Sequence, residues 1–380
     1  MSSHPLRTRS RYLFFSHDGF GLGHFRRNCL IAEALLDRDP DASVVLITGL
    51  SVPPHWVASS RAGVVQVPPL LKDSRGGYRS LSVTFDQAIE RRALIFASVV
   101  ALYRPQVVVV DRHPYGTAGE LRPGLLAARE VGVRLVLGLR DVLDEPDVVA
   151  CELAGAGWDG VPDLYDEVVV YGAPHVCDHV AEYGLPVRPR YCGWVASRSG
   201  TAVAEDNLLA VAAGGGGDGE KVFRLGVRAV ERQRGWRGHL AAGPYADSRS
   251  LRRLVRRSPA RRLLSLDTQV PECGPLFARA AAVLQMAGYN STVEALAAGQ
   301  RPILVPRRAP RREQEIRAER LAALGLCGVV EEHDDADAVV GLLDKRRRLE
   351  PGDLERAGIA LDGAVTAAAG LESLAIPALR

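Results

Sequence analysis

The sequence predicts an α/β protein of two domains, each built on a doubly wound parallel sheet. The chain has 380 residues, more than one hydrophobic core usually serves. Short apolar runs rich in valine, isoleucine and leucine alternate with longer segments of helical spacing, as in βαβ units. Several of these runs are continuously apolar, which is typical of parallel strands that helices cover on both faces.

The first half contains six apolar runs that we expect to be strands, with helices between them. The clearest helix candidates are the segments 27–39 and 81–103, which have helical spacing. The expected strands are residues 11–18, 43–49, 63–68, 106–111, 133–141 and 167–172.

The second half repeats this alternation and predicts a second sheet facing the first across a cleft. A helix is expected near 220–234, and a final alanine- and leucine-rich helix over 364–380. The apolar runs are at 207–217, 236–243, 262–267, 281–286, 301–306 and 327–332. We therefore predict an N-terminal domain over 11–195, a linker over 196–207 and a C-terminal domain over 208–363.

The composition is that of an ordinary globular protein, with 47% hydrophobic and 24% charged residues. A net charge of +3 does not indicate a nucleic-acid partner, and the arginine-rich stretches 252–262 and 307–312 lack interleaved aromatic residues. The six cysteines form no C-x-x-C pair, so neither a disulfide framework nor a zinc site is expected. No apolar run approaches a membrane span or a signal-peptide core. We expect a cytoplasmic protein without membrane insertion, as a monomer or a homodimer.

The turn GFGLGHFRRN, residues 19–28, follows the first strand and opens a helix. Its glycines let the backbone approach a ligand, and a helix N-terminus favours anions. A dinucleotide fingerprint would need an acid at the end of the second strand, but that strand ends LITG. His24 stands in this turn, where an imidazole can act as a general base near neutral pH or can cap the turn. Both interpretations stay open.

A glycine-rich turn, AAGGGGDGEK, follows the first strand of the second half. It is not a P-loop, because Lys221 does not directly follow a glycine and no Ser or Thr comes after it. The turn suits close contact with a phosphate or a sugar, although a plain flexible turn would have the same composition.

The stretch QMAGYNSTVEALAAGQRPILVP, residues 285–306, predicts another helix start at the end of a strand. Ser291 and Glu294 have the spacing of a capping box, and Gly299 fits the position just after a helix. Capping does not explain Gly288, Tyr289 and Asn290. They indicate a second helix N-terminus facing the same cleft, and two such sites in one domain suit a diphosphate. Glu294 then has an alternative role, in which it binds a ribose diol.

Two blocks of the chain resemble a known family. GFGLGHFRRNCLIAEAL, with AGYNSTVEALAAGQRPILVP and REQEIRAERL, is similar to the GT-B glycosyltransferases of the MurG type, which include the enzyme that adds N-acetylglucosamine to make lipid II. SHDGFGLGH and RREQ-x-x-RA are closer to a branch of predicted bacterial glycosyltransferases. The order of elements agrees over essentially the whole chain, whereas the sequence match is specific only in these blocks.

The resemblance implies two Rossmann-like domains, of which the C-terminal one binds the nucleotide sugar. In this family the final helix often crosses back onto the first domain. Glu294 matches the acid that binds ribose hydroxyls, and His24 matches a histidine near the reaction centre. Gln314 matches a glutamine of a Q-x-x-N-A motif that contacts the donor sugar, and Arg317 stands where that motif has asparagine. Residues 215–217 lack the serine of the family's glycine loop.

We therefore expect metal-independent transfer of a sugar from a nucleoside diphosphate to a small soluble acceptor in natural-product assembly. UDP is the first choice of donor nucleotide, with GDP and TDP as alternatives, and no cofactor is expected. Candidates for catalysis are His24, Asp111 and Asp141. Candidates for donor binding are Gly215, Gly216, Gly217, Gly288, Tyr289, Asn290, Ser291, Thr292, Glu294, Arg312 and Gln314. Candidates for acceptor binding are Gly23, His113, Tyr115, Glu120 and Arg140, which could equally be loop and cap residues.

Two other functions fit the same sequence. A nucleotide-sugar 2-epimerase shares the expected architecture but needs no acceptor. A non-catalytic nucleotide-sugar binding protein would not need the polar residues at the strand ends of the first domain.

Overall fold

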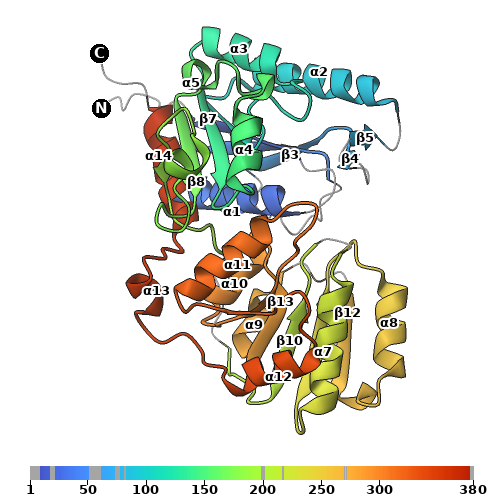
Figure 1. Ribbon diagram of the computed structural model, residues 1–380. Coiled ribbons are helices and arrows are strands. Elements are labelled where there is room, and N and C mark those ends of the chain that lie inside the picture. The colour runs from blue at the N-terminus through green and yellow to red at the C-terminus, as the bar shows by residue number, and fades with distance from the viewer. Residues whose placement is uncertain are drawn as a thin grey trace, which may run out of the picture.

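The computed structural model describes residues 9–17, 22–50, 61–72, 78–80, 83–197, 202–215, 218–268, 270 and 272–376. These residues form two α/β domains, which lie one above the other in Figure 1. Each domain has a parallel sheet with helices packed against it, as the sequence predicts.

The described part of the N-terminal domain contains a seven-stranded sheet in the order β3-β2-β1-β6-β7-β8-β9, with every pair of neighbours parallel. Its strands are β1 (Arg11–Ser16), β2 (Ser43–Thr48), β3 (Ala62–Gln66), β6 (Val107–Asp111), β7 (Arg134–Arg140), β8 (Glu167–Tyr171) and β9 (Arg190–Tyr191). The continuously apolar runs form the central strands, where side chains on both faces are buried. The order changes direction between β1 and β6, the point at which open parallel sheets bind ligands.

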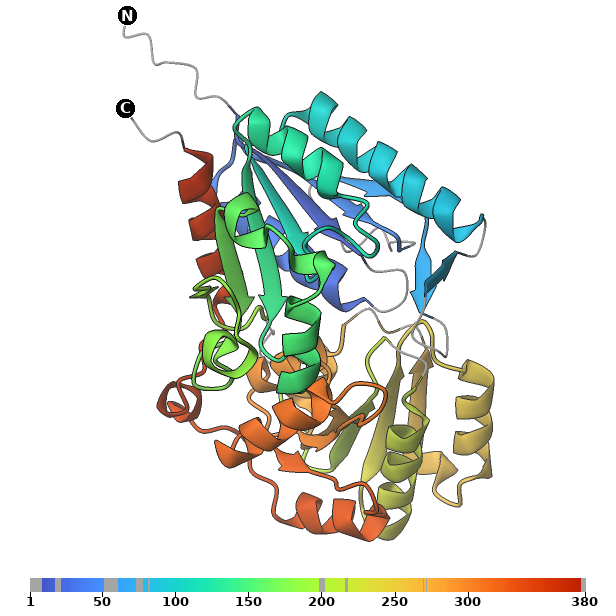
Figure 2. The same ribbon diagram turned by 45° about the horizontal axis from the view of Figure 1, so that its top comes forward.

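Helices cover both faces of this sheet, and two hydrophobic clusters lie between the layers. Helix α1 packs on one face, while α2 and α3 pack together on the other (Figures 1 and 2). The helices are α1 (Gly23–Arg38), α2 (Phe85–Tyr103), α3 (Arg122–Glu130), α4 (Pro146–Leu153), α5 (Val161–Leu164) and α6 (His179–Tyr183). A two-stranded antiparallel hairpin, β4 (Leu70–Lys72) with β5 (Tyr78–Ser80), was not expected from the sequence.

The C-terminal domain has a parallel sheet in the order β12-β11-β10-β13-β14-β15. Its strands are β10 (Leu208–Ala212), β11 (Arg237–Ala242), β12 (Leu264–Thr268), β13 (Ala282–Met286), β14 (Ile303–Val305) and β15 (Gly328–Val329). Its helices are α7 (Glu220–Arg232), α8 (Ser248–Arg257), α9 (Gly274–Arg279), α10 (Tyr289–Ala297), α11 (Glu313–Ala323), α12 (Ala336–Asp344) and α13 (Asp353–Arg356). Helices α10 and α11 lie on the side that faces the N-terminal domain (Figure 1).

The chain crosses between the domains twice, and the two crossings run beside each other. The backbone N–H of Trp194 donates to the carbonyl of Ala360 (2.8 Å), and that of Gly363 donates to the carbonyl of Trp194 (3.0 Å). The last helix, α14 (Gly363–Ala375), then packs against α1 of the N-terminal domain (Figures 1 and 2). Glu372 on α14 pairs with Arg38 at the end of α1 (3.0 Å).

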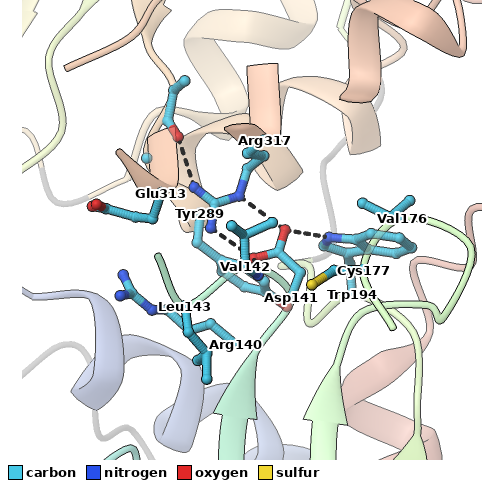
Figure 3. A network of polar contacts seen from close by, with 12 residues as sticks. Arg140, Asp141, Val142, Leu143, Val176, Cys177, Trp194, Tyr289, Glu313 and Arg317 are labelled. Carbon is cyan, nitrogen blue, oxygen red and sulfur yellow. Dashed lines mark hydrogen bonds and ion pairs between the residues drawn. The ribbon is translucent and has the colours of Figure 1, made fainter. Parts of the chain in front are cut away.

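A buried ion pair joins the domains at their centre (Figure 3). Arg317 of α11 donates from Nε to Oδ2 of Asp141 (2.8 Å) and from Nη2 to Oδ1 (2.6 Å), and both side chains are 1% exposed. Asp141, which directly follows β7, also accepts hydrogen bonds from the indole of Trp194 (3.1 Å) and the N–H of Val142 (2.7 Å). The third nitrogen of Arg317 donates to the carbonyl of Ala287 (2.9 Å). Each nitrogen of the Arg317 guanidinium and each oxygen of the Asp141 carboxylate is therefore hydrogen-bonded.

The rim of the interface carries further polar contacts. Arg320 on α11 binds Glu182 of α6 (2.5 Å), and the backbone N–H of Arg312 donates to Asp144 (2.9 Å). Arg320 and Glu182 are each 28% exposed, so their ion pair is screened by water, whereas Asp144 is buried.

Replacing Arg317 with alanine should lower the free energy of unfolding by about 3–5 kcal/mol, because it leaves the Asp141 carboxylate buried without its partner. Arg320→Ala is the matched control from the same helix and interface, and its loss should stay near 1 kcal/mol. Urea unfolding of both variants measures the difference. Equal losses would mean that the Asp141–Arg317 pair is hydrated in solution.

Candidate active site

Three backbone segments converge where the two domains meet, next to the switch point of the N-terminal sheet. The side-chain amide of Asn290, in the first turn of α10, donates to the carbonyl of Gly23 at the start of α1 (3.0 Å). The turn after β10 lies against the same place, since a Cβ added to Gly215 would be 3.2 Å from the Leu22 side chain. Gly216 and Gly217, also predicted to bind the donor, lie outside the described residues.

The start of α10 differs from the capping box that the sequence predicted. Gly288 is the N-cap residue and no side chain caps the helix. Ser291 lies inside the first turn, where its hydroxyl donates to the carbonyl of Gly288 (3.3 Å). The capping box is therefore wrong, because the helix begins two residues before Ser291. Gly299 does follow the helix in a left-handed conformation (φ 73°), as expected.

The uncapped start of α10 is suited to an anion. The first N–H groups of a helix have no partner within the helix, and they carry the positive end of its dipole. The side-chain oxygens of Asn290 and Thr292 in this turn are buried and have no hydrogen-bond partner among the described residues. A ligand placed here would find both backbone donors and unpaired polar side chains.

Glu294 lies further along α10 and contacts the segment before α9. Its carboxylate accepts a hydrogen bond from the backbone N–H of Cys273 (3.2 Å). Burial raises the pKa of Glu294, nearby Arg26 lowers it, and nearby Glu272 raises it further. Arg26 of α1 in turn forms an ion pair with Glu272 (2.5 Å), so residues of both domains surround the carboxyl group of Glu294.

A histidine and an aspartate form a pair on the N-terminal domain. Nδ1 of His24, in the first turn of α1, lies 3.0 Å from Oδ1 of Asp111 at the end of β6. The other oxygen of Asp111 accepts a hydrogen bond from Arg27 (2.5 Å). Burial alone would raise the pKa of Asp111, but Arg27 and His24 outweigh this effect and lower it to about 2. The charged carboxylate beside Nδ1 favours the tautomer with its proton on that nitrogen, which leaves the lone pair on Nε2. Nη2 of Arg27 also lies 3.0 Å from Nδ1, and a hydrogen bond from this guanidinium would require the other tautomer.

Two more histidines lie beside this pair. The ring of His17, which follows β1, is 4.5 Å from the ring of His24 and 4.7 Å from the ring of His113. Burial lowers the pKa of His17 well below its usual value, and the neighbouring histidines, Arg112 and Arg92 lower it further. His17 therefore stays neutral within a cluster of basic side chains.

Several predicted site residues are used by the protein itself. Asp141 is fully engaged by Arg317, which argues against a role as acceptor base. The hydroxyl of Tyr289 accepts from the N–H of Val195 (3.0 Å), and its ring lies between the guanidinium groups of Arg27 and Arg317. Tyr289 thus belongs to the domain interface.

The two predicted residues next to α11 are also engaged. Arg312 donates to Glu145 of the N-terminal domain (2.6 Å) and to Glu315 (2.5 Å), which argues against a role at a donor phosphate. The side-chain oxygen of Gln314 accepts from the backbone N–H of Arg307 (3.2 Å).

The predicted acceptor residues divide into two groups. Tyr115 donates to the carbonyl of Asp159 (2.6 Å), and Glu120 forms a fully buried ion pair with Arg92 (2.9 Å). Both serve the interior of the N-terminal domain, which argues against contact with an acceptor. His113, in contrast, lies just after β6 beside His17, and Arg140 is the last residue of β7, near Arg112 and Arg27.

Sequence reasoning missed Arg27, His17 and Arg112. Arg27 lies one helical turn after His24, so the spacing of three residues could have placed both on one face of α1. His17 and Arg112 directly follow residues at two strand ends, where ligands of parallel sheets bind.

No group of three or more His, Cys, Asp or Glu side chains able to hold a metal ion occurs in the described part of the chain. No described helix is long and apolar enough to cross a bilayer.

Comparisons with known proteins identify the fold. No family model and no curated protein matches the sequence. Among solved structures, the glycotransferase of kitacinnamycin is 15% identical with a TM-score of 0.67, over 98% of this chain and all of that chain. MurG of Acinetobacter baumannii is 14% identical with a TM-score of 0.55, over 95% of both chains. Medicago truncatula UGT71G1, complexed with UDP-glucose, is 12% identical with a TM-score of 0.61, over 97% and 99%. The chain therefore has the GT-B fold, as its resemblance to MurG-like proteins implied.

The low pKa of His17 gives an expected pH dependence of stability. The folded protein keeps His17 neutral, whereas the unfolded chain takes up a proton as the pH falls through about 6.5. The stabilisation is thus complete above that pH and is lost below it, by up to ~1.4 kcal/mol per pH unit for this one group. His179, whose pKa is also lowered, adds to the slope. In urea unfolding between pH 7 and 5, His17→Gln should have a shallower slope than the wild type.

His333→Gln is the control, since His333 is exposed and should leave the slope unchanged. An unchanged slope in His17→Gln would show that His17 is hydrated and charged in solution.

Proposed function

We propose that this protein is a metal-independent glycosyltransferase, which moves a sugar from a nucleoside diphosphate to a small soluble acceptor in natural-product assembly. The observation that carries the proposal is the His24–Asp111 pair, held directly beside the uncapped start of α10 by the hydrogen bond from Asn290 to Gly23. A base on one domain thus faces an anion-binding helix start on the other. The GT-B fold and structural neighbours such as the glycotransferase of kitacinnamycin agree with this function.

The donor diphosphate is assigned to the start of α10 and to the glycine-rich turn after β10. The turn brings its backbone close to α1, and Gly219 at the start of α7 leaves no room for a side chain, since a Cβ would be 2.0 Å from that of Ala213. The helix dipole and the free N–H groups stabilise the negative charge that develops on the leaving diphosphate. Divalent cations commonly stabilise a leaving diphosphate. Here we assign that role to the backbone N–H groups.

Glu294 is assigned to the ribose. Its carboxyl group lies one turn from the diphosphate position, and only one described hydrogen-bond donor, the N–H of Cys273, contacts it. A carboxylate can accept hydrogen bonds from two adjacent hydroxyls, as the ribose diol requires. UDP is the proposed nucleotide, in line with the UDP-glucose bound by one structural neighbour.

His24 is assigned as the base that takes the proton from the acceptor hydroxyl. Asp111 holds the ring through Nδ1, and Arg27 keeps Asp111 charged from its other side. Nε2 can then accept the proton while the acceptor oxygen attacks the anomeric carbon, and Asp111 stabilises the imidazolium that forms. This arrangement supports inversion, with the base and the leaving diphosphate on opposite faces of the sugar.

A thermal-shift screen of UDP, GDP and TDP tests the donor site, because a ligand that binds the folded state raises the melting temperature by mass action. We expect UDP to give the largest rise, and Glu294→Ala to weaken its affinity about 10- to 100-fold by calorimetry, as expected for hydrogen bonds to a charged group. Glu272→Ala is the control, since it removes the neighbouring acid. Unchanged affinity in Glu294→Ala would limit Glu294 to its contact with Cys273.

Replacing His24 with glutamine should lower kcat for sugar transfer by about 10²- to 10⁴-fold and leave the affinity for the nucleoside diphosphate unchanged, because general-base catalysis contributes factors of that size. Release of the nucleotide from the nucleotide sugar, with and without acceptor, measures the effect. The control is His175→Gln, an exposed histidine near the second chain crossing.

Full transfer activity in His24→Gln would contradict the assignment of the base. An epimer of the donor sugar, formed without any acceptor, would instead identify a 2-epimerase.

A further inference from the structure

Arg140 is an arginine at the domain interface whose charge is not neutralised by direct contact. It is the last residue of β7, and its carbonyl accepts a hydrogen bond from Nε2 of His179 (2.9 Å), so the backbone is held in place. Figure 3 shows its guanidinium pointing away from the Asp141–Arg317 pair, toward the side on which Glu313 lies. Among the described residues the side chain has no hydrogen bond and no ion pair, and its Nε is buried.

Two acids near Arg140 bind other arginines. Asp141 is held by Arg317, and Oε1 of Glu313 binds Arg307 (2.5 Å), while Oε2 of Glu313 is buried without a described partner. Burial lowers the pKa of Arg140 to about 10 together with the charges of Arg317, Arg112 and Arg27, against the opposing effect of Glu313. The guanidinium is therefore a charge in a partly dry site without a direct partner, which is costly unless an anion joins it.

Arg112 adds a second cation from the neighbouring strand. It follows β6 with a left-handed backbone (φ 75°), a conformation that is rare outside glycine and that concentrates at functional sites. Its side chain is 3% exposed and donates from Nη2 to Glu152 (2.7 Å), while its Nη1 is buried without a described partner. Asp111 and His113 flank it in sequence, and its charge lowers the pKa of both His17 and Arg140.

We propose that Arg140 and Arg112 form a subsite for an anionic group of the acceptor, a carboxylate or a phosphate. This inference rests on the proposed function, since it defines the acceptor as a hydroxylated acid or a phosphorylated alcohol. Guanidinium groups recognise both anions through paired N–H donors. This subsite is separate from the donor diphosphate position, which we place on the C-terminal domain. Both arginines belong to the N-terminal domain, where Arg140 ends β7 and Arg112 follows β6.

Inorganic phosphate is the probe for this subsite. Calorimetry at low salt would measure its binding to protein saturated with the nucleoside diphosphate selected by the thermal-shift screen. We expect phosphate to bind the wild type, and Arg140→Gln and Arg112→Gln each to weaken this binding at least 10-fold. Arg252→Gln on the exposed, arginine-rich helix α8 is the control for binding to the surface, and it should bind phosphate as the wild type does.

Stability distinguishes loss of the subsite from loss of the fold. Removing a cation without a partner should not lower the melting temperature, so Arg140→Gln should melt at or above the wild type without phosphate. Phosphate should then raise the melting temperature of the wild type but not that of the variant. Equal phosphate affinity in wild type and Arg140→Gln would overturn the proposal. Phosphate that competes with the nucleotide, or weaker nucleotide binding in Arg140→Gln, would also overturn it, because the arginines would then serve the donor.

A matched pair of acceptors, one anionic and one neutral, tests the subsite in the transfer reaction itself. Sugar transfer to 4-hydroxybenzoate should exceed transfer to its methyl ester at least 10-fold in kcat/KM, and Arg140→Gln should remove this preference. A preference for the ester in the wild type would contradict an anionic acceptor. If no nucleoside diphosphate binds but phosphate binding still depends on Arg140, the anion subsite holds and the glycosyltransferase proposal fails.

Discussion

The ion pair between Asp141 and Arg317 is the constraint on which the relative position of the two domains depends. It places a strand end of one sheet against α11 of the other domain, with every polar atom satisfied and both charges out of water. Such a pair adds little net stability compared with apolar residues of the same size, but it tolerates only one geometry. Because Arg317 also binds the carbonyl of Ala287, directly before the start of α10, the same contact fixes that helix start next to α1.

This constraint is compatible with entry of substrates. If the interface opens, both charges contact water again and recover much of their hydration free energy. If a substitution removes one partner, the other charge stays buried without water or a partner. The cost of separating the domains is therefore lower than the cost of the substitution. The paired crossings at Trp194 and Ala360, with α14 anchored on α1, hold the two connecting segments beside each other.

The strands and most long helices could be predicted from the sequence. Strands buried on both faces need continuously apolar runs, and amphipathic helices need apolar residues at helical spacing. Side-chain partners do not follow in the same way. Thr84 and Gln87 form a true capping box at α2, while Ser291 and Glu294, with the same spacing, do not, because α10 starts at Tyr289. Spacing limits what is possible within one helix. The partner of Glu294, however, is Cys273 before α9, and the carboxylate partner of Arg317 comes from the other domain.

The same distinction explains the catalytic candidates. Asp111 and Asp141 both lie at the carboxyl ends of the neighbouring strands β6 and β7, and the sequence cannot separate their roles. In the fold, Asp141 meets an arginine of the other domain, which uses all its acceptor capacity, whereas Asp111 meets Arg27 on one oxygen and His24 on the other. Each carboxylate binds one arginine, but their roles differ. Asp141 joins the two domains, and Asp111 orients the imidazole of His24. Arg140, at the end of β7 immediately before Asp141, is left without such a partner, which is the physical reason to seek its partner in the substrate.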